Sequence, residues 1–235
     1  MNSSETDVSG NATQDTKQRR FPSVRGEVVL AVSGLYLGIF LYYSKRLPWS
    51  PIGVVILTLT AFCLAYSLKY LHPTTLSALN ITRKRAGLYI LVGLLVILPG
   101  WFFDSLASYL SGRGWWSFGI AKSPPLIISI IIVAISEELF FRGYVQGRLK
   151  SLGGNRWVRI AAVSAIFMFY KVVVHAWDGW AFATYAGFFA FGAAEMLFET
   201  TWVDWTGSIV TSIVIHIGWD LIVFHGYTGL PPWAL

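Results

Sequence analysis

An apolar run that ends in two adjacent glutamates constrains this chain more than any other feature. The run covers residues 125–135 and is followed, after one serine, by Glu137 and Glu138. Its composition is typical of a membrane-spanning helix. A charge at bilayer depth costs about 3 kcal/mol or more, so it persists where it is paired or functional. The glutamate pair therefore predicts a functional site inside the membrane.

The composition of the whole chain also predicts a membrane protein. Of its 235 residues, 55% are hydrophobic and 13% are charged, whereas about a quarter of the residues in a soluble domain are charged. The apolar stretches approach the ~20 residues that cross a bilayer, which disfavours a soluble protein with buried strands. We predict an all-α fold, a polytopic transmembrane helix bundle of seven to eight helices. The predicted spans are residues 26–44, 50–71, 86–106, 124–149, 156–176, 179–201 and 206–226.

An eighth helix is predicted within the aromatic segment 101–118. Its tryptophans and phenylalanines favour a short helix that lies in the membrane interface. The preceding Pro99-Gly100 pair is expected to kink or end the third span.

The first residues of the chain differ in composition from the rest. Residues 1–22 are rich in Ser, Thr, Asn, Asp and Gln and nearly free of apolar side chains, which is typical of a disordered tail. The remaining residues, 23–235, are predicted to form one transmembrane domain.

Lysine and arginine are concentrated in alternate loops, which predicts the orientation of the chain. The richer side carries Lys17, Arg19, Arg20, Arg25, Arg83, Lys84, Arg85, Arg148, Lys150, Arg156 and Arg159. Because cytoplasmic loops are enriched in these residues, we predict a multi-pass protein of the cell membrane with a cytoplasmic N-terminus. The net charge of +6 is accounted for by these loops, and no basic patch indicates a nucleic-acid partner.

Helix geometry separates the two glutamates. Glu138 and Arg142 are four residues apart and share one helix face, so they are expected to form an ion pair. Glu137 is rotated by about 100° from Glu138 and faces a different neighbour. We therefore predict that Glu137 is the unpaired, desolvated carboxylate, a state suited to a general base. The alternative is that both carboxylates and Arg142 form one structural network between helices.

Two of the histidines inside predicted spans are candidate partners of Glu137. His175 is late in the fifth span, and His216 is midway through the seventh. We predict that both face one polar cavity together with Glu137. Asp220 is four residues after His216, so it is expected to share the same face and to fix the tautomer of the ring. The alternative is that each histidine is a satisfied residue of the core.

Together these motifs resemble those of a known family. The glutamate pair with Arg142, a histidine at the end of the next span, and His216 with Asp220 are similar to the motif set of the CPBP family. This family contains type II CAAX prenyl endopeptidases and proteins of bacteriocin processing or immunity. Its members are glutamate-dependent intramembrane proteases. The resemblance covers roughly residues 124–226.

The resemblance implies a role for each residue. Glu137 would be the base that activates water, His175 would help to hold that water, and His216 would stabilise the oxyanion. Glu138, Arg142 and Asp220 would orient the site. The resemblance implies no cofactor and no metal. The substrate would be a protein or peptide with a membrane-embedded or lipidated segment, namely a prenylated CAAX protein, a bacteriocin leader or a sorting anchor.

The sequence departs from the family pattern at several positions. Lys171 stands where the family has an aromatic residue, and it can reach the interface or act on His175. Asp220 stands where the family often has Asn, so it cannot donate to an oxyanion unless it is protonated. Glu195 and Glu199 have no clear counterpart in the family. They are expected either to line the mouth of the cavity or to face the water interface, and we favour the interface for Glu199.

Three other functions are compatible with parts of the sequence. A zinc metalloprotease is disfavoured because the sequence contains no H-E-x-x-H motif and only one cysteine, Cys63. A proton-coupled transporter is disfavoured because no internal repeat is present. A non-catalytic immunity or partner protein is disfavoured because the polar motif residues are all retained.

Overall fold

The computed structural model describes residues 23–43, 75–82, 85–110, 119–177 and 182–224, and the described residues are helical without strands. The helices are α1 (Val24–Tyr43), α3 (Ala86–Leu110), α4 (Pro124–Glu138), η2 (Leu139–Val145), α5 (Gln146–Ser151), α6 (Arg156–Trp177), α7 (Phe182–Thr206) and α8 (Val210–Val223). The all-α fold class is confirmed. Because the predicted span 50–71 and the predicted tail 1–22 lie outside the described residues, the number of helices and the disordered tail stay predictions.

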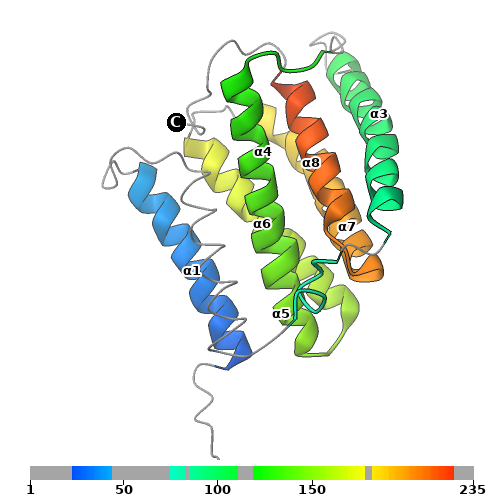
Figure 1. The fold of residues 1–235 in the computed structure, drawn as a ribbon. Helices are drawn as coiled ribbons and strands as arrows, with labels where there is room; N and C mark the ends of the chain where they lie inside the picture. The colour runs from blue at the N-terminus through cyan, green and yellow to red at the C-terminus, as the bar shows by residue number, and fades with distance from the viewer. Residues whose placement is uncertain (1–22, 44–74, 83–84, 111–118, 178–181, 225–235) are drawn as a thin grey trace, which may run out of the picture.

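The long helices stand side by side and alternate in direction from α3 onward (Figure 1). In the centre, α4 packs against α8, which in turn packs against α3, while α6 packs against α7. The helix α1 contacts α5 and α6 at the opposite edge from α3. The glutamate pair at the end of α4 therefore lies against helices that come later in the chain, α6 and α8.

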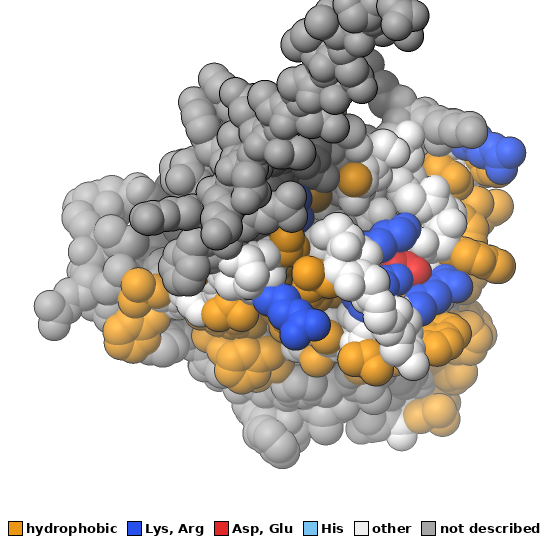
Figure 2. Space-filling view, turned by 90° about the horizontal axis from the view of Figure 1, so that it is seen from below, with side chains coloured by type: hydrophobic (Ala, Val, Ile, Leu, Met, Phe, Trp, Pro, Cys, Tyr) orange, Lys and Arg blue, Asp and Glu red, His pale blue; other side chains and the backbone are white. Residues whose placement is uncertain are grey.

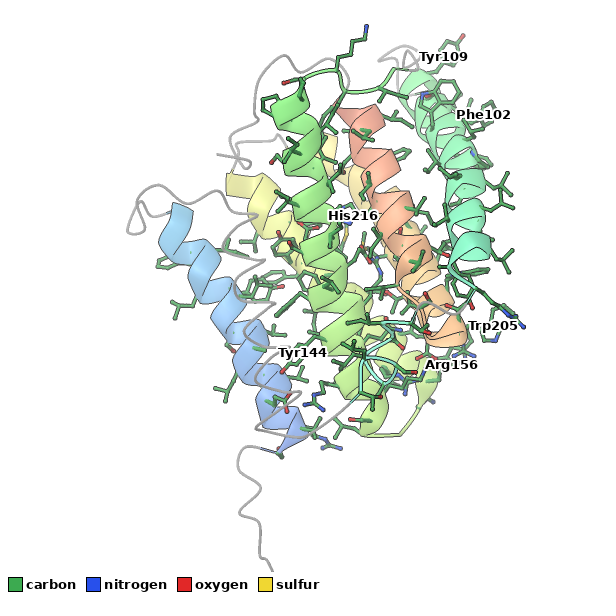
Figure 3. All side chains as sticks on the ribbon, in the orientation of Figure 1. Phe102, Tyr109, Tyr144, Arg156, Trp205 and His216 are labelled. Atoms are coloured by element: carbon green, nitrogen blue, oxygen red, sulfur yellow. The ribbon has the colours of Figure 1, made fainter. Side chains whose placement is uncertain are left out.

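Two described stretches are long and apolar enough to cross a membrane, Ala86–Phe103 in α3 and Pro124–Ser151 in α4, η2 and α5. Only 11% of the first stretch is buried inside the protein. The core helix of a soluble protein would bury such a surface, because exposed apolar area is unfavourable in water. The exposed leucines and phenylalanines of α3 instead fit contact with lipid (Figure 3 shows Phe102 at this outer edge).

The third predicted span differs from the observed helix in one respect. Pro99 lies inside α3 and does not end it, and the helix continues to Leu110. The first part of the predicted interfacial segment 101–118 is therefore a continuation of α3 and not a separate helix. Proline is tolerated inside transmembrane helices because neighbouring groups can satisfy the freed backbone carbonyl. Residues 111–118 lie outside the described residues.

Close packing of α3 on α8 depends on one glycine from each helix. A Cβ atom on Gly93 would lie 2.7 Å from the Cβ of Val214, and one on Gly218 would collide with Ile97. Small residues let helix backbones approach closely, which is how transmembrane helices gain packing energy in the absence of a hydrophobic driving force. These contacts fix α8, and hence His216, relative to α3.

The fourth predicted span, 124–149, is interrupted by a π-helical segment. The segment η2 begins immediately after Glu138 and contains Arg142. Its wider turn is a rare departure from the α-helix that is frequent at functional sites. The backbone around the glutamate pair is therefore locally distorted at the position where the sequence predicts chemistry.

The segment 75–82 packs against this distorted region. The side chain of Asn80 donates a hydrogen bond from Nδ2 to the carbonyl oxygen of Arg142 at 3.0 Å. The backbone carbonyl of Asn80 accepts a hydrogen bond from the amide of Ile209. A Cβ on Gly147 would lie 2.7 Å from the Cα of Leu79, so only glycine permits this approach. Asn80 adopts a left-handed conformation, with φ of 59°, which asparagine tolerates better than most residues. Segment 75–82 thus links η2 to the start of α8.

A buried polar contact also ties α1 to this region. Tyr144 and Arg148 both donate to Glu27 Oε1, each at 2.8 Å. Figure 3 shows Tyr144 between α1 and the α4–α5 region. Because Glu27 is buried, a partner of opposite charge is required to stabilise it there.

Basic side chains gather at the end of the bundle where α6 begins and α7 ends. Arg156 Nε lies 2.9 Å from Asp204 Oδ2, Arg159 Nη2 lies 2.8 Å from Asp204 Oδ1, and Lys150 donates to the Asp204 carbonyl. We call these four residues the basic end. Figure 2, which views the molecule from below, shows Lys and Arg side chains gathered around acidic atoms, with hydrophobic side chains around them. This end contains the loop that the sequence places on the Lys- and Arg-rich side.

Candidate active site

Arg142 is the centre of a buried ion-pair network. It is fully buried, and its guanidinium pairs with Glu138 and, through Nη2, with Glu199 Oε2 at 2.5 Å. The face of the Phe167 ring lies under the guanidinium, 4.7 Å from the ring centroid to Cζ. The predicted pairing of Glu138 with Arg142 is confirmed.

The expectation that Glu199 faces the water interface is wrong. Its side chain is 1% exposed and contacts Arg142. A guanidinium has five donors, so one carboxylate cannot satisfy it. The second carboxylate comes from α7 for this reason.

The expectation that Glu137 is unpaired is also wrong. As predicted, Glu137 does not face Arg142, but its Oε2 lies 2.6 Å from the ammonium of Lys171, and Tyr170 donates its hydroxyl to Oε1 at 2.8 Å. Both partners come from α6. The side chain of Glu137 is only 3% exposed, so its charge requires a partner of opposite charge. Arg142 is already paired with the adjacent Glu138. Lys171 supplies this charge.

Lys171 points into the bundle and not toward the interface. Its side chain is 15% exposed, and its Nζ atom lies between Glu137 and the His216 ring, 3.3 Å from Nε2. The predicted alternative that Lys171 extends to the membrane surface is therefore wrong. The residue that departs most clearly from the family pattern lies in the middle of the site.

His216 faces the glutamates from α8. Figure 3 shows its place between α4 and α8. Its Nδ1 atom lies 3.0 Å from Glu138 Oε1, and its Nε2 atom lies 3.5 Å from Glu137 Oε2. The structure thus brings His216 to Glu137, as the sequence predicts, and it also brings His216 to Glu138.

The expected role of Asp220 as the group that orients His216 is not supported by the distances. Asp220 Oδ2 lies 3.6 Å from Nε2, beyond hydrogen-bond distance, although the two residues share a helix face. Glu138 contacts the other ring nitrogen at 3.0 Å. A neighbour from another helix therefore orients the ring more directly than the residue one turn away.

The structure says less about two other residues that the sequence singles out, His175 and Glu195. His175 lies on α6 one turn after Lys171, and its side chain is outside the described part of the structure. Its predicted role in holding water stays a prediction. Glu195 is half-buried on α7 and interacts electrostatically with His216 and Arg142.

Sequence reasoning missed Tyr170 and misplaced Lys171, although a signal was present. Phe167, Tyr170, Lys171 and His175 follow the spacing of one helix face, and Phe167 lies under Arg142. Lys171 lies in an apolar helix and on the same face as a candidate histidine of the site. A lysine in such a position predicts a buried acidic partner.

We call the six ionisable residues that these pairwise contacts connect the charged core: Glu137, Glu138, Arg142, Lys171, Glu199 and His216. It combines a carboxylate, a histidine and an ammonium within hydrogen-bond reach of one another. Such a set can accept a proton, orient a small molecule and stabilise negative charge in a medium of low dielectric constant.

No group of three or more His, Cys, Asp or Glu side chains among the described residues is arranged to hold a metal ion.

The chain matches one family model, over residues 120–222, whose description is "Type II CAAX prenyl endopeptidase Rce1-like". No curated protein and no solved structure was found to match the chain. The matched segment begins just before α4 and ends within α8, so it contains the charged core. The family is a membrane-embedded protease family, which supports hydrolase activity at the coarse level. Over residues 120–222 the chain is similar to the Rce1-like family of type II CAAX prenyl endopeptidases, and this match confirms the resemblance that the glutamate and histidine motifs predict.

Proposed function

We propose that this protein is an intramembrane endopeptidase that hydrolyses a peptide bond with water activated by Glu137. The observation that carries the proposal is the convergence of Glu137 and His216 in the interior of the bundle, within the segment that matches the protease family. Buried charges at such a depth are expensive, and function is the common reason for keeping them.

The reaction would proceed in two proton transfers. Glu137 takes a proton from a water molecule, and the resulting hydroxide attacks the carbonyl carbon of the scissile bond. The carbonyl oxygen becomes an oxyanion on the side of Glu137 where Lys171 and His216 lie. When the tetrahedral intermediate collapses, the carbon–nitrogen bond breaks and protonated Glu137 returns its proton to the leaving amine. A carboxylate is regenerated and no covalent intermediate with the enzyme forms.

The remaining residues would hold this arrangement. Arg142 keeps Glu138 ionised, and Glu138 in turn fixes the His216 ring through Nδ1. Tyr170 limits the rotation of the Glu137 carboxylate by donating to Oε1. We propose that His175, one turn beyond Lys171, helps to position the attacking water.

The substrate would be a protein or peptide that carries a lipidated or membrane-embedded segment. A base enclosed by apolar helices is reached most easily by a scissile bond that an apolar anchor brings into the bilayer. The family description favours a prenylated CAAX sequence, while bacteriocin leaders and sorting anchors present the same chemistry.

We further propose that the protein is a multi-pass protein of the cell membrane whose N-terminus is cytoplasmic. The start of α1 and the basic end lie at the same end of the bundle in Figure 1, and positive charge marks cytoplasmic loops. Residues 23–235 would then form one transmembrane domain.

Cleavage by the purified protein tests this proposal. The protein is reconstituted in phosphatidylcholine vesicles with a fluorogenic peptide that ends in a farnesylated CAAX sequence. Wild type is expected to cleave it, and Glu137→Gln is expected to lose about 10²–10⁴-fold in rate. Equal rates for the two proteins would overturn the proposal.

A chelator experiment separates this mechanism from zinc catalysis. The activity is expected to survive phenanthroline at a concentration that inactivates a zinc protease in the same vesicles. Loss of activity that added zinc restores would contradict water activation by Glu137 alone and would favour a metalloprotease.

A further inference from the structure

We infer that Lys171, and not His216, is the group that donates to the oxyanion. This inference rests on the proposed function and assigns a catalytic residue that the motif pattern does not contain. It follows from the hydrogen-bonding capacity of the groups around the His216 ring.

The first step concerns Nδ1 of His216. This atom lies 3.0 Å from Glu138 Oε1, and the same oxygen pairs with Arg142. Because an arginine stays protonated, Glu138 beside it is ionised and can only accept a hydrogen bond. Nδ1 must therefore carry the proton of the ring.

The second step concerns Nε2. A neutral imidazole has one N–H, so a ring protonated at Nδ1 has a bare Nε2. The ammonium of Lys171 lies 3.3 Å from Nε2 and can only donate. A hydrogen bond between them thus requires Nε2 to be the acceptor. Neutral His216 in this arrangement has no proton to offer to an oxyanion through Nε2.

The third step concerns the position of Lys171. Its Nζ atom contacts Oε2 of Glu137, the oxygen that lies on the His216 side, and it carries three protons. A substrate carbonyl attacked by water at Glu137 would place its oxygen within reach of this ammonium. A full positive charge that faces a developing negative charge in an apolar medium stabilises it more than a neutral donor does.

Charged groups on three helices surround the ammonium. Glu137 and Glu138 face it from α4, Asp220 and His216 from α8, and Glu195 lies near it on α7. These carboxylates hold the charge in place. The contact between Lys171 and Glu137 must loosen when substrate enters. The negative charge of the tetrahedral intermediate would then replace part of the interaction that Lys171 loses with Glu137. His216 acts as a positioning residue, because it accepts from Lys171 and directs the ammonium.

The ring tautomer can be measured without any activity. In ¹⁵N NMR of the full-length protein labelled at histidine, with the His216 signals assigned from a His216→Gln variant, we expect a protonated Nδ1 and a bare Nε2 near neutral pH. A His216 Nε2 that carries a proton in the resting protein would overturn the inference, whatever the enzyme cleaves.

Kinetics with the farnesylated peptide give the second test. Lys171→Met is expected to lower kcat about 10²–10³-fold with a small change in KM, while Lys171→Arg, which keeps charge and donors, retains most of the activity. The loss in Lys171→Met is expected to persist at every pH. If activity instead returns fully at high pH, Lys171 only keeps Glu137 ionised and the inference is wrong.

The Glu137→Gln variant separates this inference from the proposed function. If Glu137→Gln is inactive and Lys171→Met is as active as wild type, the inference fails and the protease proposal stands. If Glu137→Gln is fully active, the protease mechanism itself fails. If Lys171→Met does not fold, Lys171→Arg and the tautomer measurement still test the inference. Lys171→Arg keeps the positive charge and the donors, so a loss of more than 100-fold in its activity would contradict the inference.

Discussion

The charged core and the basic end use the same kinds of side chain in different surroundings. In the charged core, Arg142 is fully buried between Glu138 and Glu199. In the basic end, Arg156 reaches Asp204 with a side chain that is 38% exposed. An ion pair that water can screen contributes little, whereas an uncompensated charge in an apolar interior is strongly destabilising. Similar contacts should therefore respond very differently to substitution.

Replacement of Arg142 should have the largest effect on stability. Arg142→Ala leaves two buried carboxylates, Glu138 and Glu199, without their cation, and we expect a loss of about 3–5 kcal/mol. Thermal unfolding in detergent measures this loss. A variant with the thermal stability of wild type would show that the network in the charged core is not needed for the fold.

Removal of one carboxylate from this network should reduce stability less than removal of Arg142. Glu199→Gln keeps a neutral acceptor near Arg142, and the pair with Glu138 remains, so we expect a loss of about 1.5–3 kcal/mol. The same unfolding assay compares it with Arg142→Ala. A loss as large as that of Arg142→Ala would mean that Glu199, and not Glu138, is the main partner of the guanidinium.

Substitution of a tightly packed glycine next to the charged core should also lower the stability of the protein. The Cβ of Gly147→Ala would press on the backbone of Leu79 and displace segment 75–82, with an expected loss of about 1–3 kcal/mol. Gly34→Ala on α1 is the matched control, because nothing lies within 4 Å of the added Cβ. Equal stability of the two variants would show that segment 75–82 does not depend on this contact.

The smallest effect is expected at the basic end. Arg156→Ala removes a partly exposed partner of Asp204, and Arg159 remains in place, so the loss should stay below about 1 kcal/mol. Increasing the salt concentration should reduce even this difference. A loss comparable to that of Arg142→Ala would contradict the distinction between the two regions.

Local geometry made part of the site predictable from the sequence. Glu138 and Arg142 pair because they are four residues apart on one helix, and no tertiary information is needed. The same rule predicted that His216 would face Asp220, but Glu138 from another helix is the closer partner. Spacing within a helix shows which residues share a face. It does not show which residues of a neighbouring helix lie opposite that face.

The contacts that the sequence did not reveal all join distant segments. Lys171 meets Glu137, and Asn80 caps a carbonyl of the π-helical segment. Buried Glu27 pairs with Arg148 in the same way. Each contact depends on how α1, segment 75–82, α4 and α6 are arranged in space. The long helices that the structure describes were predictable because long apolar segments leave few alternatives.

The most direct test of the central claim is terminal mapping of membrane and surface proteins in cells that express this protein. Wild type is compared with Glu137→Gln at equal expression, because this substitution removes the base and keeps the shape of the side chain. We predict that one protein or a small group keeps an uncut terminus in the variant, and the retained segment then identifies the substrate class. Identical termini in the two strains, with wild type demonstrably present, would contradict the protease assignment and favour a non-catalytic partner or immunity protein.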